Sequence, residues 1–175
     1  MISDTPNIKQ IIRDIPDFPK KGILFKDITP LLQQADAFRL AIDEFTKELS
    51  KKKIDDVVGI ESRGFIFSPV VAYQLKAGFI PVRKKGKLPF KTHQVSYDLE
   101  YGSAVLEIHQ DALPPGSRVA IVDDLLATGG TALAAAQLVE KLGAKVEKIA
   151  FVIELLFLNG REKLSGYDIF SLIQY

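Results

Sequence analysis

Apolar residues gather along the chain in short runs, and longer segments with helical periodicity lie between them. Five runs are predicted to form buried strands: Val57–Ile60, Phe79–Arg83, Arg118–Val122, Val146–Glu154 and Asp168–Ile173. Helices are predicted over Gly64–Lys76, which stops before Gly78, and over about Thr131–Leu142, which Gly143 ends. Strands that alternate with helices in this way predict an α/β fold, with a mainly parallel twisted sheet and helices on both faces.

Two regions depart from this order. Near the N-terminus, Pro6–Ile12 is predicted as a short helix, and the proline- and glycine-rich stretch Pro16–Pro30 as ordered loop. Asp36 is then expected to cap a helix with an apolar stripe of Phe38, Ile42, Phe45 and Leu49. In the middle, Lys84–His109 lacks a steady period, although Ser103–His109 alternates as a partly exposed strand would. We interpret this middle region as a mobile excursion from the sheet.

Composition narrows the class of protein. The 175 residues suit a single domain, and a hydrophobic content of 47% allows a sizeable core. Lysine and arginine total 23 against 22 acidic residues, so neither nucleic acid nor a membrane surface is an expected partner. The chain has no cysteine, which excludes disulfides, thiolate nucleophiles and zinc–thiolate sites. No apolar run approaches the ~20 residues of a membrane helix, and we expect a cytoplasmic protein.

The strongest local motif is the string AIVDDLLATGGT, residues 120–131, in which an apolar strand leads through two carboxylates and a small-residue turn into a helix. A helix start offers unpaired backbone N–H groups to an anion, and Gly129 and Gly130 let the backbone approach it closely. Thr128 and Thr131 add hydroxyl donors. Carboxylates just before this turn would repel a phosphate but accept hydrogen bonds from sugar hydroxyls. The motif therefore predicts a ribose-5-phosphate site, and it is neither a Walker P-loop nor a dinucleotide fingerprint.

Residues 122–131 resemble the defining motif of the type I phosphoribosyltransferases, which have a Rossmann-like fold. Further stretches resemble the adenine phosphoribosyltransferase family, in family order: Asp17–Pro19, Gly22–Pro30, Glu61–Phe65, Arg83–Pro89, Tyr97–Gly102 and Gly160–Leu164. The phosphate motif is common to the class, whereas Gly22–Pro30 and the Leu-Glu-Tyr-Gly of residues 99–102 single out the adenine branch. The resemblance implies one domain over residues 1–175, with a base-binding hood at about 1–35 and a mobile lid at about 83–103.

The resemblance also implies a role for each matching residue. The ribose diol is held by Asp123 and Asp124, and the 5-phosphate by Ala127, Thr128, Gly129, Gly130 and Thr131. Pyrophosphate is bound by Glu61, Ser62, Arg63, Arg83, Lys84 and Lys87, with some cations acting across a dimer interface. Adenine is bound by Leu24, Phe25, Lys26 and Leu125. Arg63 and Glu100 are catalytic, the latter handling the proton of the base, and Tyr101 closes over the site.

Pattern alone leaves simpler interpretations open for several of these residues. Arg63 could pair with a surface carboxylate, the cations between Arg83 and Lys91 could form a solvated face, and Phe25 could belong to the core. Lys26 stands where the family commonly has arginine, which matters if the guanidinium reads the base. His93 and His109 have no partner pattern and are interpreted as surface or structural residues.

The predicted activity is transfer of the phosphoribosyl group from phosphoribosyl pyrophosphate to adenine, giving AMP and pyrophosphate in purine salvage. Mg²⁺ is expected as cofactor, held mainly by the substrate with no direct protein ligand, because a diphosphate needs a hard cation. A homodimer is implied by the resemblance. Two alternatives are a phosphoribosyltransferase for another nucleobase and a non-catalytic, effector-binding regulator on the same fold. The regulator needs a DNA-binding element, and the residues before Val57 show no helix-turn-helix.

Overall fold

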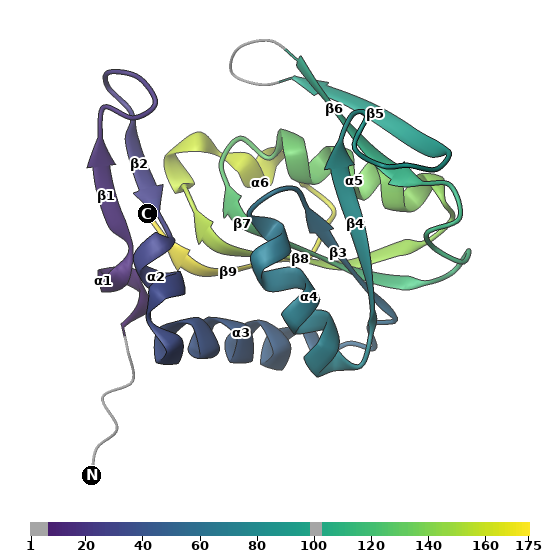
Figure 1. The fold of residues 1–175 in the computed structure, drawn as a ribbon, viewed down its shortest axis with the longest axis horizontal. Coiled ribbons are helices and arrows are strands. Elements are labelled where there is room, and N and C mark those ends of the chain that lie inside the picture. The colour runs from purple at the N-terminus through teal and green to yellow at the C-terminus, as the bar shows by residue number, and fades with distance from the viewer. Residues whose placement is uncertain (1–6, 99–102) are drawn as a thin grey trace. The chain divides into compact units, whose positions relative to one another are not determined.

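The computed structural model describes residues 7–98 and 103–175 (Figure 1). The chain divides into two compact units, Met1–Glu44 and Phe45–Tyr175, with the boundary inside helix α3 (Ala35–Leu49). Helix α3 begins one residue before Asp36, so this aspartate lies in its first turn. None of the helices in the described ranges is long and apolar enough to cross a membrane.

The N-terminal unit contains a hairpin between short helices. Helix α1 (Ile8–Ile11) precedes β1 (Arg13–Pro16), which pairs antiparallel with β2 (Leu24–Asp27) before helix α2 (Thr29–Gln33). The stretch from 16 to 30 was predicted to be mostly ordered loop, but it contains β2 and the start of α2. Pro19 and Gly22 lie in the turn between the strands, where the Asp17 carboxylate accepts a hydrogen bond from Gly22 N at 2.7 Å, whereas Pro16 ends β1 and Pro30 lies in α2. Because turn residues lie next to such short strands, the four-residue strands cannot be recognised from the sequence pattern.

The larger unit is built on a seven-stranded sheet in the order β5-β6-β4-β3-β7-β8-β9. Five strands are parallel, as predicted: β3 (Asp56–Ile60), β4 (Gly78–Lys84), β7 (Arg118–Leu126), β8 (Lys145–Glu154) and β9 (Ile169–Gln174). The central pair β3 and β7 is in register from Asp56 opposite Val119 to Gly59 opposite Val122. This register brings the ends of the two strands to the same edge of the sheet.

Helices α4 (Gly64–Leu75) and α5 (Gly130–Lys141) lie on opposite sides of this sheet (Figure 1). The alanine-rich face of α5 packs on fully buried residues that include Val58, Ile121 and Phe151. On the α4 side, a Cβ on Gly59 would come within 2.0 Å of Ser68 Oγ, so only glycine allows α4 to approach β3 this closely. The prediction of helices on both faces is confirmed.

Two strands of the middle region belong to the sheet, so the prediction that this region leaves the sheet is wrong, whereas the strand predicted at Ser103–His109 is confirmed. The mobility of the region stays a prediction. Strands β5 (Thr92–Asp98) and β6 (Ser103–His109) form an antiparallel hairpin, and β6 pairs with the end of β4 through Arg83 and Lys84. The hairpin is the edge of the sheet, where one face is partly exposed and the apolar period is weak. That partial exposure explains why the sequence pattern looks irregular.

Paired charges lie at the edge of the sheet where the parallel strands begin. Arg118, at the start of β7, donates to both carboxylate oxygens of Asp55 at 2.8 and 2.6 Å. On β8, the mostly buried Lys148 contacts Glu48 at 2.5 Å and Asp168 at 3.2 Å. Hydrogen bonds from arginine hold the pKa of Asp55 down to about 2. These closed pairs fix the starts of the strands to one another.

Candidate functional site

The opposite edge of the sheet, where β3 and β7 end, borders a cavity of about 310 Å³. Residues after β3 and residues at the end of β7 form most of its wall, and β4 and β5 add one residue each. The cavity is lined by Ile60, Glu61, Ser62, Arg63, Lys84, Tyr97, Asp123, Asp124, Leu125, Ala127 and Thr131. Ligands of parallel α/β sheets bind at this edge, because strand ends and helix starts meet there. The structure thus brings the predicted ribose residues together with Glu61, Ser62, Arg63 and Lys84.

Two adjacent carboxylates stand at the end of β7. Asp123 and Asp124 are 8% and 6% exposed, and Asp124 N donates to Asp123 Oδ1 at 2.9 Å. Arg63 Nε lies 2.9 Å from Asp124 Oδ2, so this arginine pairs with a buried carboxylate that lines the cavity. The start of α4 lies close to Asp123, and only glycine fits at position 64, since a Cβ there would meet Asp123 Oδ1 at 2.8 Å.

Burial raises the pKa of both carboxyls. The charge of Asp124 raises the pKa of Asp123 further, whereas the Arg63 guanidinium lowers the pKa of Asp124. A carboxyl that is ready to share a proton or accept one suits hydrogen bonding to sugar hydroxyls. The position of the pair at the cavity wall and its raised pKa values therefore suit binding of a diol.

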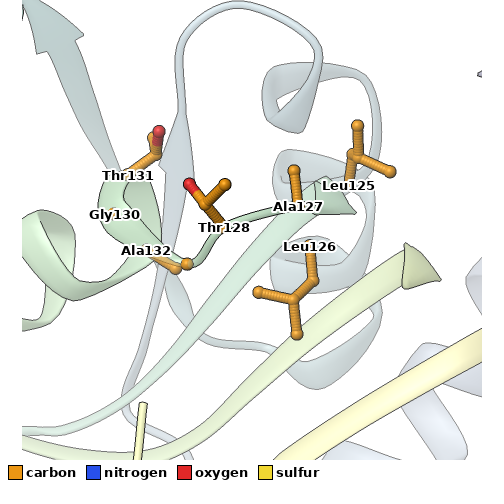
Figure 2. Close-up of a pocket in the computed structure, with 8 residues that line it drawn as sticks. Leu125, Leu126, Ala127, Thr128, Gly130, Thr131 and Ala132 are labelled. Carbon is orange, nitrogen blue, oxygen red and sulfur yellow. The ribbon is translucent and has the colours of Figure 1, made fainter. Parts of the chain in front are cut away.

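The loop after β7 forms a small cavity of about 60 Å³, which Figure 2 shows. The side chains of Thr128 and Thr131 present their hydroxyls on one side of the loop, while Leu126 points away into the core. Gly129 adopts a positive φ of 81° and precedes the first residue of α5. A 12-residue helix directs its N–H groups and positive dipole end toward this turn. The geometry is that of an anion cradle.

A short helix behind this loop was not predicted to take part in the site. Gly160, which opens α6 (Gly160–Lys163), lies so close that a Cβ would meet Ala127 O at 2.3 Å. A Cβ on Gly129 would likewise meet Gly160 O at 2.5 Å. Helix α6 is fixed by Arg161, which donates to buried Glu154 at 2.5 and 2.8 Å. Only the match at Gly160–Leu164 signalled this support, and that match named no role.

Helix α6 follows β8 through a one-turn 3₁₀ helix, η1 (Leu156–Leu158). Leu155 N donates to Leu126 O at 2.9 Å, which joins the end of β8 to the end of β7. The loop 127–131 therefore rests on backbone from two neighbouring strand ends.

Glu61 accepts hydrogen bonds from the last residues of β4 and from the turn that follows it. Its carboxylate accepts from Arg83 Nε at 3.1 Å, from Lys87 Nζ at 2.8 Å and from Lys84 N at 3.2 Å. Burial would raise the pKa of Glu61, but the hydrogen bonds from Lys87, Arg83 and Lys84 lower it to about 2. Arg83 and Lys87 thus contact Glu61, whereas Lys84 lines the cavity and forms no ion pair within the described residues.

The predicted base-binding residues fall in both units. Leu24, Phe25 and Lys26 lie on β2 of the N-terminal unit, where Phe25 packs edge-to-face on Phe18 with ring centroids 5.1 Å apart. Lys26 pairs with Asp14 at 2.6 Å. Leu125, from the larger unit, lines the cavity. Glu100 and Tyr101 lie outside the described residues.

Comparison with known proteins places this geometry in a family. The phosphoribosyl transferase domain matches residues 31–172. An adenine phosphoribosyltransferase from Roseiflexus sp. (strain RS-1) is 58% identical over 171 residues, which are 98% of this chain and 99% of the relative.

Two crystal structures of adenine phosphoribosyltransferases have nearly the same fold. The enzyme from Thermoanaerobacter pseudethanolicus has a TM-score of 0.94 and 58% identity, over 96% of this chain and 98% of its own. The enzyme from Saccharomyces cerevisiae, complexed with an imino-altritol bisphosphate and adenine, has a TM-score of 0.91 and 46% identity, over 95% and 96%.

Proposed function

The chain belongs to the phosphoribosyltransferase family and, within it, to the adenine phosphoribosyltransferases, and we propose on this premise that it makes AMP and pyrophosphate from adenine and phosphoribosyl pyrophosphate. The observation that carries the proposal is the cavity of about 310 Å³, whose lining includes the buried carboxylate pair together with Ala127 and Thr131 of the proposed phosphate loop. Phosphate at one end and a diol at the other match ribose 5-phosphate. The reaction serves purine salvage.

The chemistry at this cavity is substitution at the anomeric carbon. A ring nitrogen of adenine forms the new bond, the bond to the pyrophosphate oxygen breaks, and the proton of the base is released. We propose that Asp123 and Asp124 hold the ribose hydroxyls while Ala127–Thr131 anchor the 5-phosphate. Positive charge develops on the sugar as the leaving group departs, so the negative charge that this pair shares beside the ring stabilises that state. We propose that Arg63, which pairs with Asp124, acts between the ribose and the departing diphosphate.

The pyrophosphate site is proposed from the residues after β3 and from the end of β4 with the turn that follows it. Ser62 and Arg63 line the cavity together with Lys84. Glu61, Arg83 and Lys87 form the ion cluster beside them. Cations near the leaving oxygen stabilise the charge that develops there.

Mg²⁺ is the proposed cofactor. No group of three or more potential metal ligands occurs within residues 7–98 and 103–175. The oxygen-rich wall at Asp123 and Asp124 fits a hard cation whose ligands come mainly from substrate and water. These two residues would hold it indirectly, through the ribose hydroxyls. When bound, Mg²⁺ neutralises charge on the diphosphate and favours its departure.

For the base, we propose Leu24, Phe25, Lys26 and Leu125. The Phe25 ring offers a flat face to a heteroaromatic ring, and main-chain groups of β2 can read its edge. The ion pair of Lys26 with Asp14 engages its charge within the N-terminal unit, which is consistent with main-chain recognition of the base. Glu100 is proposed to handle the proton of the base, and Tyr101 to close over it.

Assembly and dynamics complete the proposal. We propose a cytoplasmic homodimer in which the segment from about 83 to 103 acts as a lid. A lid is useful here because water would hydrolyse the oxocarbenium-like state. Within the described residues, Tyr97 of β5 supports this role, since it lines the cavity.

Turnover with adenine, guanine, hypoxanthine and a pyrimidine, each with and without Mg²⁺, tests the function. We expect that adenine is the only one of these bases to be converted with phosphoribosyl pyrophosphate, giving AMP and pyrophosphate, and that the conversion requires Mg²⁺. Preference for another base would replace the adenine assignment. Binding of phosphoribosyl pyrophosphate with no turnover on any base would favour the effector-binding regulator.

A further inference from the structure

The carboxylate of Glu61 is almost enclosed by donors from a single short segment. Its side chain is 8% exposed, whereas Arg83 and Lys87 are 33% and 50% exposed. The donors are the Arg83 guanidinium, the Lys84 backbone N–H and the Lys87 ammonium. Arg83 Nη1 also donates to Lys87 O at 3.0 Å, which closes the segment on itself. One carboxylate thereby fixes both ends of the turn between Arg83 and Lys87.

A second carboxylate holds the same turn from its other side. Glu107 of β6 is 3% exposed and accepts from Gly86 N at 3.0 Å and from Gln94 Nε2 at 2.8 Å. Glu107 does not line the cavity, but Glu61 does. Of these two carboxylates, Glu61 is therefore the one that connects the turn to the place where a ligand binds.

An ionised carboxylate does not favour direct contact with pyrophosphate, because both are anions and repel each other. Glu61 stays ionised at neutral pH, since its cationic partners lower its pKa to about 2. Its contribution must then pass through the groups that it holds. Long flexible cations lose side-chain entropy when a ligand orders them, and prior ordering by a carboxylate removes part of that cost.

We propose that Glu61 is a positioning residue that prepares Arg83, Lys84 and Lys87 for the leaving group before substrate arrives. This inference rests on the proposed function and assigns Glu61 a role distinct from direct contact with pyrophosphate. The hydrogen bond from Lys84 N sets the backbone from which the Lys84 side chain reaches the cavity wall. The bonds to Arg83 and Lys87 keep two more cations adjacent to that wall.

The decisive variant is Glu61→Gln, which keeps the size of the side chain and removes its charge. Asp55→Asn is the matched control, because Asp55 is also paired with an arginine but lies before β3, where the site is not. Binding of inorganic pyrophosphate with Mg²⁺ is measured by calorimetry, and KM is measured separately for phosphoribosyl pyrophosphate and adenine.

In Glu61→Gln we expect Kd for pyrophosphate and KM for phosphoribosyl pyrophosphate to rise about tenfold, the size of one lost charge-assisted hydrogen bond. KM for adenine should stay within about twofold, and Asp55→Asn should leave all three constants within about twofold. Unchanged or tighter pyrophosphate binding in Glu61→Gln, or an equal loss in Asp55→Asn, would overturn the inference.

A double-mutant cycle separates positioning from a direct role. If Glu61 acts through its partners, Glu61→Gln added to the pair Arg83→Met and Lys87→Met should weaken pyrophosphate binding by less than about twofold further. A full additional tenfold loss would show that Glu61 acts independently of them. Failure of the proposed function is distinguishable, because the wild-type protein would then not convert adenine and phosphoribosyl pyrophosphate.

Discussion

The parallel strands carry charged residues at both ends, but the two edges of the sheet use them differently. At the starting edge, Asp55 and Arg118 satisfy each other through two side-chain hydrogen bonds and a backbone bond from Arg118 N. At the ending edge, Glu61 collects more cations than it can neutralise, and Lys84 lines a cavity without an ion pair within the described residues. The Asp55–Arg118 pair uses its charges within the pair, whereas the cluster around Glu61 keeps positive charge available to a ligand in the cavity.

The two carboxylates that flank β3 make this difference clear. Asp55 and Glu61 lie immediately before and after the same strand, and arginine partners help to hold both pKa values at about 2. Titration behaviour therefore does not tell a structural ion pair from a functional one. What distinguishes them is the neighbouring geometry, because only the strand ends meet the starts of α4 and α5.

The largest expected effect belongs to the ending edge. Asp124→Ala should lower kcat/KM roughly 10- to 150-fold, because it removes charged hydrogen bonds to the ribose worth ~1.5–3 kcal/mol. Steady-state kinetics measure the loss, and circular dichroism checks that the fold is intact. Asp55→Asn, at the starting edge, should keep kcat/KM within about twofold. A well-folded Asp124→Ala protein with near-normal kcat/KM would remove the ribose assignment.

The strand, turn and helix start at the ending edge could be predicted from the sequence because they follow one another along the chain. The string of residues 120–131 contains strand, carboxylates, turn and helix start in one stretch, and the structure assembles it as expected. The contact of Glu61 with Arg83 and Lys87 spans more than 20 residues and depends on the register of β3 with β4. Sequence pattern does not give that register residue by residue, so the contact of Arg83 and Lys87 with Glu61 was not predicted. Their role at pyrophosphate, which the family resemblance implies, stays a prediction.

The misread regions have the same cause. The β1–β2 hairpin and strand β5 are partly exposed, so neither shows the continuous apolar run of a buried parallel strand. Strand β6, in contrast, has the bounds of the strand predicted at Ser103–His109. Support of the phosphate loop by Gly160 is tertiary contact between segments about 30 residues apart, which no local pattern encodes. Glu100 and Tyr101 lie outside the described residues, and their roles stay predictions.

A glycine comparison sharpens the difference between the edges. Gly160→Ala places a Cβ 2.3 Å from Ala127 O, so the backbone of the phosphate loop must shift. We expect KM for phosphoribosyl pyrophosphate to rise about tenfold, since misplacement of the anchor weakens every contact made by the loop. Initial rates at varied phosphoribosyl pyrophosphate give this KM directly.

Gly116→Ala is the matched control, before β7 at the starting edge. No atom lies within 4 Å of the added Cβ, but φ is +85°, so the substitution strains the backbone without touching the site. It should lower stability by about 1 kcal/mol and leave KM for phosphoribosyl pyrophosphate unchanged. Equal KM values for Gly160→Ala and wild type would separate α6 from the phosphate site.

The smallest expected effect is on stability in acid, where the two edges should behave alike. Asp55 and Glu61 have pKa values of about 2 in the folded protein, against ordinary values of 3.8 and 4.5. A pKa lowered by folding means that the carboxylate stabilises the fold above its ordinary pKa, and that this contribution is lost as pH falls toward the folded value. Each residue should therefore steepen the fall in Tm between about pH 4.5 and about pH 2.

Asp55→Asn and Glu61→Gln should each lower Tm by a few degrees at neutral pH and converge toward wild type in acid. Thermal melts across this range measure the convergence relative to wild type, which cancels the shared contribution of Glu48, Glu154 and Asp168. If Tm of either variant stays below wild type by a constant amount at every pH, that carboxylate does not carry the lowered pKa. Convergence of both, together with loss of pyrophosphate binding in Glu61→Gln alone, would mean that the same ion-pair chemistry stabilises both edges and serves substrate at one.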